Sequence, residues 1–389
     1  MTFASDRISA NQESLVKQRY ETQSKERIAR TSRFSFDPEK IMQHVRSHII
    51  GQQAALDEIE NMLITVKADF NAPTRPLAVT LMLGPTGVGK TETVRLIAEA
   101  IHGKPDAFCR IDMNTLAQEH YAAALTGTPP GYVGSKEGNT LFDESQIQGS
   151  FTKPGIVLFD EIEKASTEVI RGLLNVLETG TLKLTAGTKM LDFKNCLIFM
   201  TSNVAAKDAQ TRLRQLEKLP KVFQQVARLI KLDDQQITER ALFKKFDPEF
   251  LNRIERILHY QAVDADVAPT LVALELKKLN QRLQKQSRSV ELTTAATQFL
   301  STGHDIRFGA RGLGRRFRTL VEPALARHLM QHPDASQISI DYDGKTIQVQ
   351  SAPVESVIDD PLLMMDDKSN NSKNQLYSTS IKGIDHATY

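Results

Sequence analysis

The chain has few cysteines, almost no net charge and no long hydrophobic run. Its 389 residues include two cysteines, Cys109 and Cys196, each in an apolar stretch without metal-ligand spacing. This predicts buried free thiols in a reducing compartment, by default the cytoplasm. A formal net charge of +2 argues against a dedicated nucleic-acid binder. The sequence has no bilayer-length apolar run, no signal-peptide core at its start and no zinc pattern among its histidines, so we expect no membrane contact.

A glycine-rich motif is the most informative feature that is present. Residues 84–91 match the phosphate-binding pattern G-x-x-x-x-G-K-[ST] at every fixed position. An apolar strand precedes the motif, and an amphipathic helix ending near Gly103 follows it, which argues against a chance glycine-rich turn. Backbone N–H groups and the helix N-terminus would bind phosphate, Lys90 would reach the β- and γ-phosphates, and Thr91 would ligate Mg²⁺. The predicted nucleotide-binding residues are Gly84, Pro85, Thr86, Gly87, Val88, Gly89, Lys90 and Thr91.

Two adjacent carboxylates follow a second apolar run. Residues 155–159 form a predicted buried strand, and Asp160 and Glu161 stand at its carboxyl end. Ligands of open α/β sheets bind beyond the carboxyl ends of the strands, so both acids are expected to face the nucleotide. Asp160 would hold Mg²⁺ and Glu161 would act as general base on the attacking water. The alternative, an acidic pair capping the next helix, does not explain the phosphate-loop motif upstream.

Three further polar residues are weaker candidates. Asn203 ends another apolar strand and could position the attacking water, or be a simple turn residue. Arg253 follows a helix start with Asp247 as N-cap and Pro248 at its first position. It could neutralise transition-state charge or form a surface salt bridge. Arg311 opens a helix and could contact the γ-phosphate, or belong to a solvated basic face.

The pattern of elements predicts an α/β ATPase domain followed by a smaller helical domain. Apolar runs at 77–83, 107–112, 155–159 and 195–200 alternate with amphipathic helices, as in a parallel sheet with helices on both faces. Leucine spacing predicts two long helices after residue 261, and alternation around Asp343-Gly344 predicts a β-hairpin with a type I′ turn. The expected division is a polar helical extension 1–45, a large domain 46–261, a small domain 262–350 and a disordered tail 351–389.

The order of the motifs resembles one family. The series is GPTGVGKT at 84–91, RIDM at 110–113, GTPPGYVG at 127–134, VLFDEIEKA at 157–165, MTSN at 200–203, DPEFLNRI at 247–254 and FGARGL at 308–313. It resembles the second ATPase module of Clp unfoldases and disaggregases of the ClpB/ClpA type, within the AAA+ superfamily. The resemblance covers about residues 45–350 and implies a P-loop AAA+ large domain with a small C-terminal lid domain.

The resemblance also implies roles for individual residues. Asn203 matches the sensor 1 position, Arg311 the sensor 2 arginine, and Arg253 an arginine finger that acts on the neighbouring subunit's nucleotide. A finger acting in trans implies a ring, expected to be a hexamer. Tyr132, with Val133, matches the pore-loop position that grips a polypeptide, and its flanking glycines fit an exposed loop. Ile50, at the start of the globular region, is expected to contact the nucleotide.

Some segments depart from the family pattern. The separate N-terminal domain and first ATPase module are not found in this sequence, which implies a single-module protein whose adaptor surface lies in residues 1–45 or 204–245. Extra residues at 140–153 alter the pore-loop base, and 180–189 lacks the usual arginines of a second pore loop. No glycine occurs between Gly187 and Gly303, so the peptidase-docking tripeptide of the family is absent and we expect no docking to a ClpP-type peptidase.

These observations predict a ring ATPase that uses ATP and Mg²⁺ to thread polypeptide through a central pore. One alternative is an ATP-driven assembly or regulatory scaffold dedicated to one partner complex, for which Tyr132 would be dispensable. Another is a nucleic-acid-remodelling ATPase, against which the near-neutral charge argues.

Overall fold

The computed structural model describes most of the chain between residues 32 and 351. The described residues are 12, 14–18, 32–117, 142–183, 190–204, 234–263, 265–302 and 309–351. The expected pore-loop residues Tyr132 and Val133, most of the 204–245 segment and the expected tail beyond Ser351 lie outside them. Among the described helices, none combines the length and the apolar character that crossing a bilayer requires.

A five-stranded parallel sheet is the centre of the large domain. Its strands are β1 (Ala78–Leu83), β2 (Cys109–Asp112), β3 (Gly155–Asp160), β6 (Cys196–Ser202) and β7 (Arg256–His259). Their order is β2-β3-β6-β1-β7, and every neighbouring pair is parallel. The first four correspond to the predicted apolar runs. The edge strand β7 escaped prediction because Leu258 is its one buried residue.

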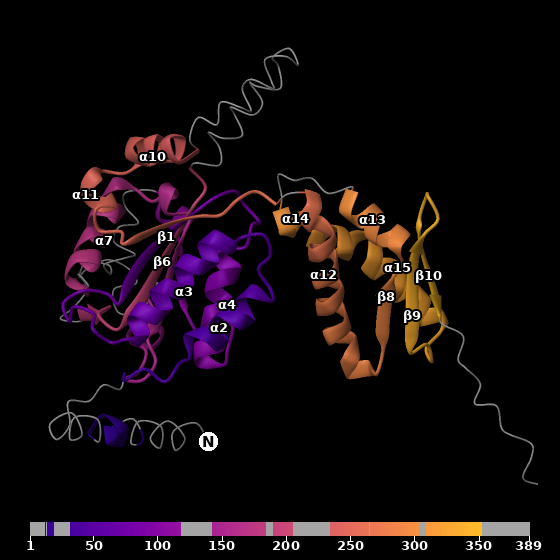
Figure 1. Cartoon of the computed structure of the whole chain (residues 1–389), viewed down its shortest axis with the longest axis horizontal. Helices are drawn as coiled ribbons and strands as arrows, with labels where there is room; N and C mark the ends of the chain where they lie inside the picture. The colour runs from indigo at the N-terminus through magenta and orange to yellow at the C-terminus, as the bar shows by residue number, and fades with distance from the viewer. Residues whose placement is uncertain are drawn as a thin grey trace, which may run out of the picture. The chain divides into compact units, whose positions relative to one another are not determined.

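Helices cover both faces of this sheet (Figure 1). Side chains of β1 alternate between two cores, with Met82 on one side and Leu81 and Leu83 on the other, as the two-residue period of a strand requires. One face is covered by α2 (Pro38–Arg46), α3 (Gln53–Lys67) and α4 (Lys90–His102). The other is covered by α6 (Glu144–Gln148), α7 (Thr167–Thr179), α10 (Asp234–Lys245) and α11 (Pro248–Leu251). Short elements are η1 (Met113–Leu116), η3 (Ile162–Lys164), and the hairpin β4 (Thr181–Lys183) and β5 (Met190–Asp192).

The helix predicted to carry Arg253 is shorter than expected. It ends at Leu251, and the next turn is tight because the Arg253 N–H donates to the Phe250 carbonyl. The Glu255 N–H then donates to the Val79 carbonyl, so the chain has already joined the sheet. Arg253 therefore lies in the connection between α11 and β7.

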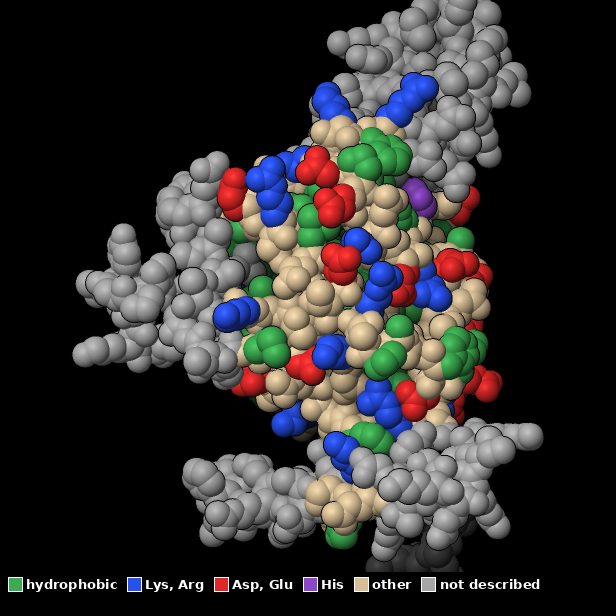
Figure 2. Space-filling view, turned by 90° about the vertical axis from the view of Figure 1, so that its left-hand side faces the viewer, with side chains coloured by type: hydrophobic (Ala, Val, Ile, Leu, Met, Phe, Trp, Pro, Cys, Tyr) green, Lys and Arg blue, Asp and Glu red, His purple; other side chains and the backbone are tan. Residues whose placement is uncertain are grey.

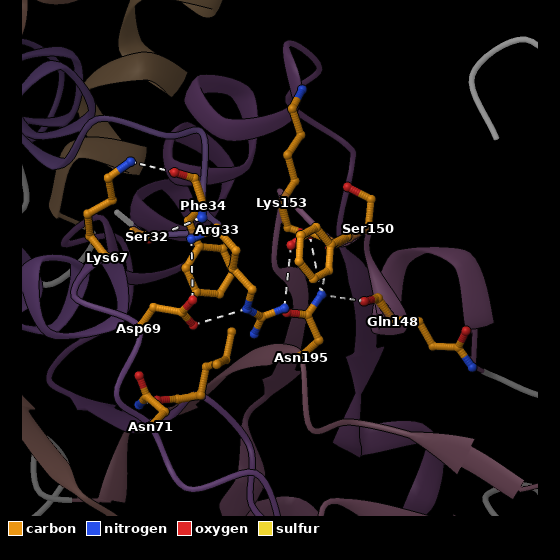
Figure 3. A network of polar contacts seen from close by, with 12 residues as sticks. Ser32, Arg33, Phe34, Lys67, Asp69, Asn71, Gln148, Ser150, Lys153 and Asn195 are labelled. Atoms are coloured by element: carbon orange, nitrogen blue, oxygen red, sulfur yellow. Dashed lines mark hydrogen bonds and ion pairs between the residues drawn. The ribbon is translucent and has the colours of Figure 1, made fainter. Parts of the chain in front are cut away.

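Residues 32–45, here called the strap, pack into the large domain, although the sequence analysis places them in the expected extension 1–45. Phe34 and Phe36 are 2% and 6% exposed and belong to the same core as α2, α3 and α4. Figure 3 shows how this strap is held: Arg33 Nε donates to Asp69 Oδ1 (3.0 Å) at the end of α3. Its Nη1 donates to the Phe151 carbonyl (3.4 Å). The two phenylalanines were missed because they stand in a polar segment without helical or strand periodicity.

Loop 148–153, which the strap contacts, also forms hydrogen bonds with Asn195. The Asn195 Nδ2 group donates to the carbonyls of Gln148 and Ser150, both at 2.9 Å (Figure 3). The Ser35 N–H donates to the Thr152 carbonyl (2.9 Å). Strap, loop 148–153 and the start of β6 are thus joined at the amino ends of the strands, opposite the edge where the carboxylates stand.

The C-terminal part of the described chain is mainly helical, with a small sheet. Its elements are η4 (Ala265–Val267), α12 (Ala268–Leu283), η5 (Gln284–Gln286), β8 (Ser289–Leu292), α13 (Thr294–Thr302), α14 (Gly309–Arg316), a π-helical turn (Phe317–Val321), α15 (Glu322–Gln331), β9 (Gln337–Tyr342) and β10 (Ile347–Ser351). The sheet order is β10-β9-β8. The predicted hairpin is present, but residues 343–346 form a four-residue connection and not a type I′ turn, because Asp343 Oδ1 accepts the N–H groups of Lys345 and Thr346.

Candidate nucleotide site

The glycine-rich loop connects β1 to α4 at the carboxyl edge of the sheet. Gly84, Gly87 and Gly89 have φ values of 145°, 79° and 107°, which side chains with a Cβ rarely adopt. A Cβ on Gly84 would lie 2.3 Å from the Tyr260 carbonyl oxygen. The loop therefore needs glycine both for its backbone conformation and for its contact with the chain after β7.

Lys90, the first residue of α4, lies under this loop with 7% of its surface exposed. Its Nζ donates to the carbonyl oxygens of Gly84 and Pro85 and to Asn203 Oδ1, the last at 2.9 Å. Burial lowers the pKa of Lys90 to about 8, because desolvation disfavours the charged form. The carboxylates of Glu163, Asp160 and Glu161 oppose this shift, and the positive charge of Arg311 adds to it.

Asp160 is 8% exposed, and both of its carboxylate oxygens are engaged. Oδ1 accepts a short hydrogen bond from the Thr201 hydroxyl and a longer one from the Thr91 hydroxyl (3.4 Å). Oδ2 accepts from Arg110 Nη2 at 2.6 Å and from Arg110 Nε at 3.2 Å. The two predicted metal ligands, Thr91 and Asp160, are therefore direct neighbours.

Glu161 has a left-handed backbone conformation, with φ 56° and ψ 52°. For a residue with a side chain this costs about 1–3 kcal/mol, and such strain is concentrated at functional sites. Its N–H donates to the Thr201 hydroxyl (2.9 Å). Its carboxylate accepts from Asn114 Nδ2 (2.8 Å) and Asn203 Nδ2 (3.4 Å). Two amides from different strand ends thus orient the predicted general base.

A third carboxylate, Glu163, holds the backbone of Asn203. Its side chain is 7% exposed, and its Oε1 accepts the backbone N–H of Asn203 (3.1 Å). Asn203 is thereby held through its backbone by Glu163 and through its side chain by Lys90 and Glu161. The ends of β1, β3 and β6 are joined in one polar network.

Arg311 stands on a helix that contacts the glycine-rich loop, and Ile50 follows a residue that lies near this loop. The Ala310 N–H at the start of α14 donates to the Gly87 carbonyl (2.9 Å), which places the helix that carries Arg311 against the loop. Ile50 packs against the hydrophobic core as a half-buried side chain. Its neighbour Ile49 would lie 3.1 Å from a Cβ on Gly89.

Arg253 has a different partner. Its Nη2 donates to Glu178 Oε1 on α7 (3.0 Å), and the two side chains are 26% and 49% exposed. This is the surface ion pair that the sequence left open as the alternative. Tyr132 and Val133 lie outside the described residues.

The sequence analysis missed two site residues: Arg110, which donates hydrogen bonds to Asp160, and Asn114, which donates one to Glu161. Both flank Asp112 at the end of β2, and the register pairs Asp112 with Asp160 of β3. Polar residues at the carboxyl end of the 107–112 run were the available signal. They could not be connected to the acids without knowing that β2 and β3 are neighbours.

The donor set fits Mg·ATP. Mg²⁺ typically takes one or two protein oxygens together with substrate phosphates, and the Thr91 hydroxyl and Asp160 carboxylate are of this kind. The loop supplies a buried ammonium and glycines that leave room for phosphate oxygens. A phosphate-binding loop, a strand-end Asp-Glu pair and an asparagine on the neighbouring strand, in a sheet of this order, define a P-loop ATPase of the AAA+ class.

Comparisons with known proteins agree with this class. Residues 75–257 match the family model "AAA domain (Cdc48 subfamily)", and residues 264–340 match "C-terminal, D2-small domain, of ClpB protein". The "ATP-dependent protease ATP-binding subunit-like protein AmiB" of Pseudomonas aeruginosa is 46% identical over 308 residues, covering 79% of this chain and 83% of the relative. ClpC of Staphylococcus saprophyticus, an ATP-dependent Clp protease ATP-binding subunit, is 34% identical over 309 residues, which are 77% of this chain and 36% of ClpC.

A solved structure extends the likeness to three dimensions. A closed-state cryo-EM reconstruction of Hsp104 with ATPγS and FITC-casein superposes with a TM-score of 0.67 at 26% identity, covering 81% of this chain and 52% of that one. The chain belongs to the Clp-type AAA+ ATPases, the family of unfoldases and disaggregases. The expected P-loop fold with its small C-terminal domain is confirmed, and so are ATP hydrolysis as its reaction and the use of ATP with Mg²⁺.

Proposed function

We propose that this ATPase drives polypeptide through the pore of a homo-oligomeric ring. The observation that carries the proposal is the network joining Lys90, Asp160, Glu161 and Asn203 at one loop. It supports the roles of a phosphate-binding cation, a metal-binding carboxylate, a base and an orienting amide for these four side chains. Its architecture is the large domain 46–261, extended by the strap 32–45, and the small domain 262–350.

The proposed chemistry assigns one task to each residue. The N–H groups of the glycine loop and the Lys90 ammonium hold the phosphates. Thr91 and Asp160 would hold Mg²⁺, which would supply positive charge to neutralise developing phosphate charge. Glu161 accepts a proton from the attacking water, and Asn203 orients that water. Arg311 adds positive charge near the phosphates from the second domain, and Ile50 contacts the nucleotide at the edge of the site.

Arg253 is proposed to act on the neighbouring subunit's nucleotide. Its partner Glu178 stands on α7, away from the network around Lys90, and both side chains are partly exposed. This placement supports a role outside its own subunit's site, with the Glu178 pair opening when subunits meet. A ring, most simply a hexamer as in the family's trans-acting scheme, completes each site with the adjacent arginine.

The remaining assignments rest on sequence. Tyr132 and Val133 are proposed to grip the polypeptide, and residues 1–45 or 204–245 to receive an adaptor. Docking to a ClpP-type peptidase is not proposed. The two buried cysteines, which form no disulfide, fit a reducing cytoplasm. On the face shown in Figure 2, Lys and Arg side chains are intermixed with Asp and Glu, unlike the single-sign stripe of a nucleic-acid-binding surface.

A substitution at Tyr132 separates threading from a scaffold role. Tyr132→Ala should abolish unfolding of a tagged reporter protein while ATP turnover and ring mass stay near wild type. Tyr121→Ala, in the same segment but outside the glycine-flanked motif, is the matched control. Unchanged reporter unfolding in Tyr132→Ala would contradict the threading model, and a strict monomer by mass with bound ATP would contradict the shared site.

A further inference from the structure

Arg110 forms an ion pair with Asp160 in which the arginine side chain is exposed and the carboxylate is mostly buried. The Arg110 side chain is 54% exposed and that of Asp160 is 11% exposed. Asp160 is held at its other oxygen by Thr201 and Thr91. An exposed guanidinium on a flexible stem can therefore leave a carboxylate that itself cannot move far.

The guanidinium is paired with the carboxylate that would hold the metal ion. Both Arg110 contacts are made to Oδ2 of Asp160, whereas Thr91, the other proposed metal ligand, contacts Oδ1. Mg²⁺ would bind a carboxylate oxygen at about 2.0–2.1 Å. A divalent cation and a guanidinium on the two oxygens of one carboxylate would repel each other strongly.

We propose that Arg110 is a placeholder cation: it neutralises Asp160 while metal is absent, and its displacement sets the affinity of the site for Mg²⁺. The inference rests on the proposed role of Asp160 and adds a positioning residue that acts through it. Because Arg110 competes with the metal and does not bind the phosphates, its removal strengthens metal binding and leaves metal-free nucleotide binding unchanged.

The charge balance around Asp160 supports this role. Asp160, Glu161 and Glu163 act together on Lys90, whose ammonium is already committed to the loop carbonyls and Asn203. Arg110 is the cation that directly contacts Asp160 among the described residues. Without metal, loss of Arg110 would leave Asp160 with no contacting cation among the described residues, which favours uptake of another.

The test is a titration of the full-length protein, saturated with ADP, with Mn²⁺ as a spectroscopic substitute for Mg²⁺, followed by EPR. Arg110→Ala should tighten Mn²⁺ binding by about three- to tenfold, the range expected for a partly exposed, charge-assisted pair. Arg110→Lys should tighten it less, because a charge remains. Arg95→Ala is the control and should leave Mn²⁺ affinity unchanged, because it removes an arginine of similar exposure that pairs with Glu92 on α4 and not with Asp160.

Two further measurements separate this inference from the proposed function. Asp160→Asn should weaken Mn²⁺ binding; if it does not, Asp160 is no metal ligand and both proposals fall. If Asp160→Asn weakens binding but Arg110→Ala leaves it unchanged or weaker, the placeholder role alone is wrong. ADP affinity in EDTA should be equal in wild type and Arg110→Ala, whereas a loss there would make Arg110 a phosphate ligand and overturn the proposal.

Discussion

The side-chain amide of Gln52 pairs with both backbone groups of Gln261. Its Nε2 donates to the Gln261 carbonyl (3.0 Å) and its Oε1 accepts the Gln261 N–H (2.8 Å). Gln52 is 3% exposed and precedes α3, whereas Gln261 follows β7 on the way to α12. One buried side chain thus bonds both backbone groups of Gln261, which lies in the linker between the two domains and is 209 positions away in the sequence.

Gln52→Ala should lower the free energy of unfolding by about 1–3 kcal/mol, because two partly buried backbone groups lose their partners. Gln53→Ala is the matched control: Gln53 is exposed and its amide donates to Asp57, so its loss should cost no more than about 0.5 kcal/mol. Denaturant unfolding measures the stability of both variants, and equal effects would contradict the stabilising role of Gln52.

Nucleotide affinity should fall as pH rises through about 8. The folded pKa of Lys90 is about 8 because the ammonium is buried, and above that pH the loop loses the charge that attracts phosphate. At pH 9 the affinity for a non-hydrolysed ATP analogue should be about tenfold lower than the low-pH limit, as expected when only the charged form binds.

The lowered pKa of Lys90 affects protein stability in the opposite direction: stability rises with pH, whereas nucleotide affinity falls. The folded pKa lies below the unfolded value of 10.5, so between about pH 8 and 10.5 the unfolded state binds more protons, and the contribution of Lys90 to stability grows with pH. Lys90→Arg stays charged and should remove most of both dependences. Equal analogue affinity of the wild type at pH 7 and pH 9 would contradict the assigned role.

Gly309→Ala should be destabilising and should weaken nucleotide binding. Gly309 has a φ of 52°, and a Cβ there would lie 2.6 Å from the Gly87 carbonyl oxygen. The expected loss is about 1–3 kcal/mol from backbone strain and displacement of α14. Gly172→Ala is the control with the opposite sign: it lies within α7 with open space around it, so it should stabilise by about 0.5–1 kcal/mol. A neutral Gly309→Ala in calorimetry would contradict the close contact.

The parts of the fold that sequence predicted are those encoded locally. The strand before Gly84 and the helix ending at Gly103 follow from apolar runs, helical spacing and glycine position. The acids at 160 and 161 follow from their place after a buried strand. These features need only neighbouring residues, so the fold class could be predicted, and the comparisons confirm it.

The parts that sequence missed depend on contacts between distant segments. Arg110 and Asn114 reach the acids because β2 lies beside β3, and Gln52 reaches Gln261 because α3 begins beside the end of β7. Phe34 is buried because the strap packs against the large domain, and the sequence of the strap has no helical or strand periodicity that would predict this. The turn after β9 differs from type I′ because one side chain, Asp343, caps two N–H groups. None of these pairings is visible before the topology is known.

ATP turnover by Glu161→Gln tests the central claim most directly. The substitution keeps the size of the side chain and one of the two oxygens that Asn114 and Asn203 contact, but it removes the basic carboxylate. Turnover should fall by about 10²–10⁴-fold, the usual contribution of a general base, while ATP affinity and ring mass stay near wild type. Turnover within about twofold of wild type would contradict the assignment of Glu161 and, with it, the account of this site.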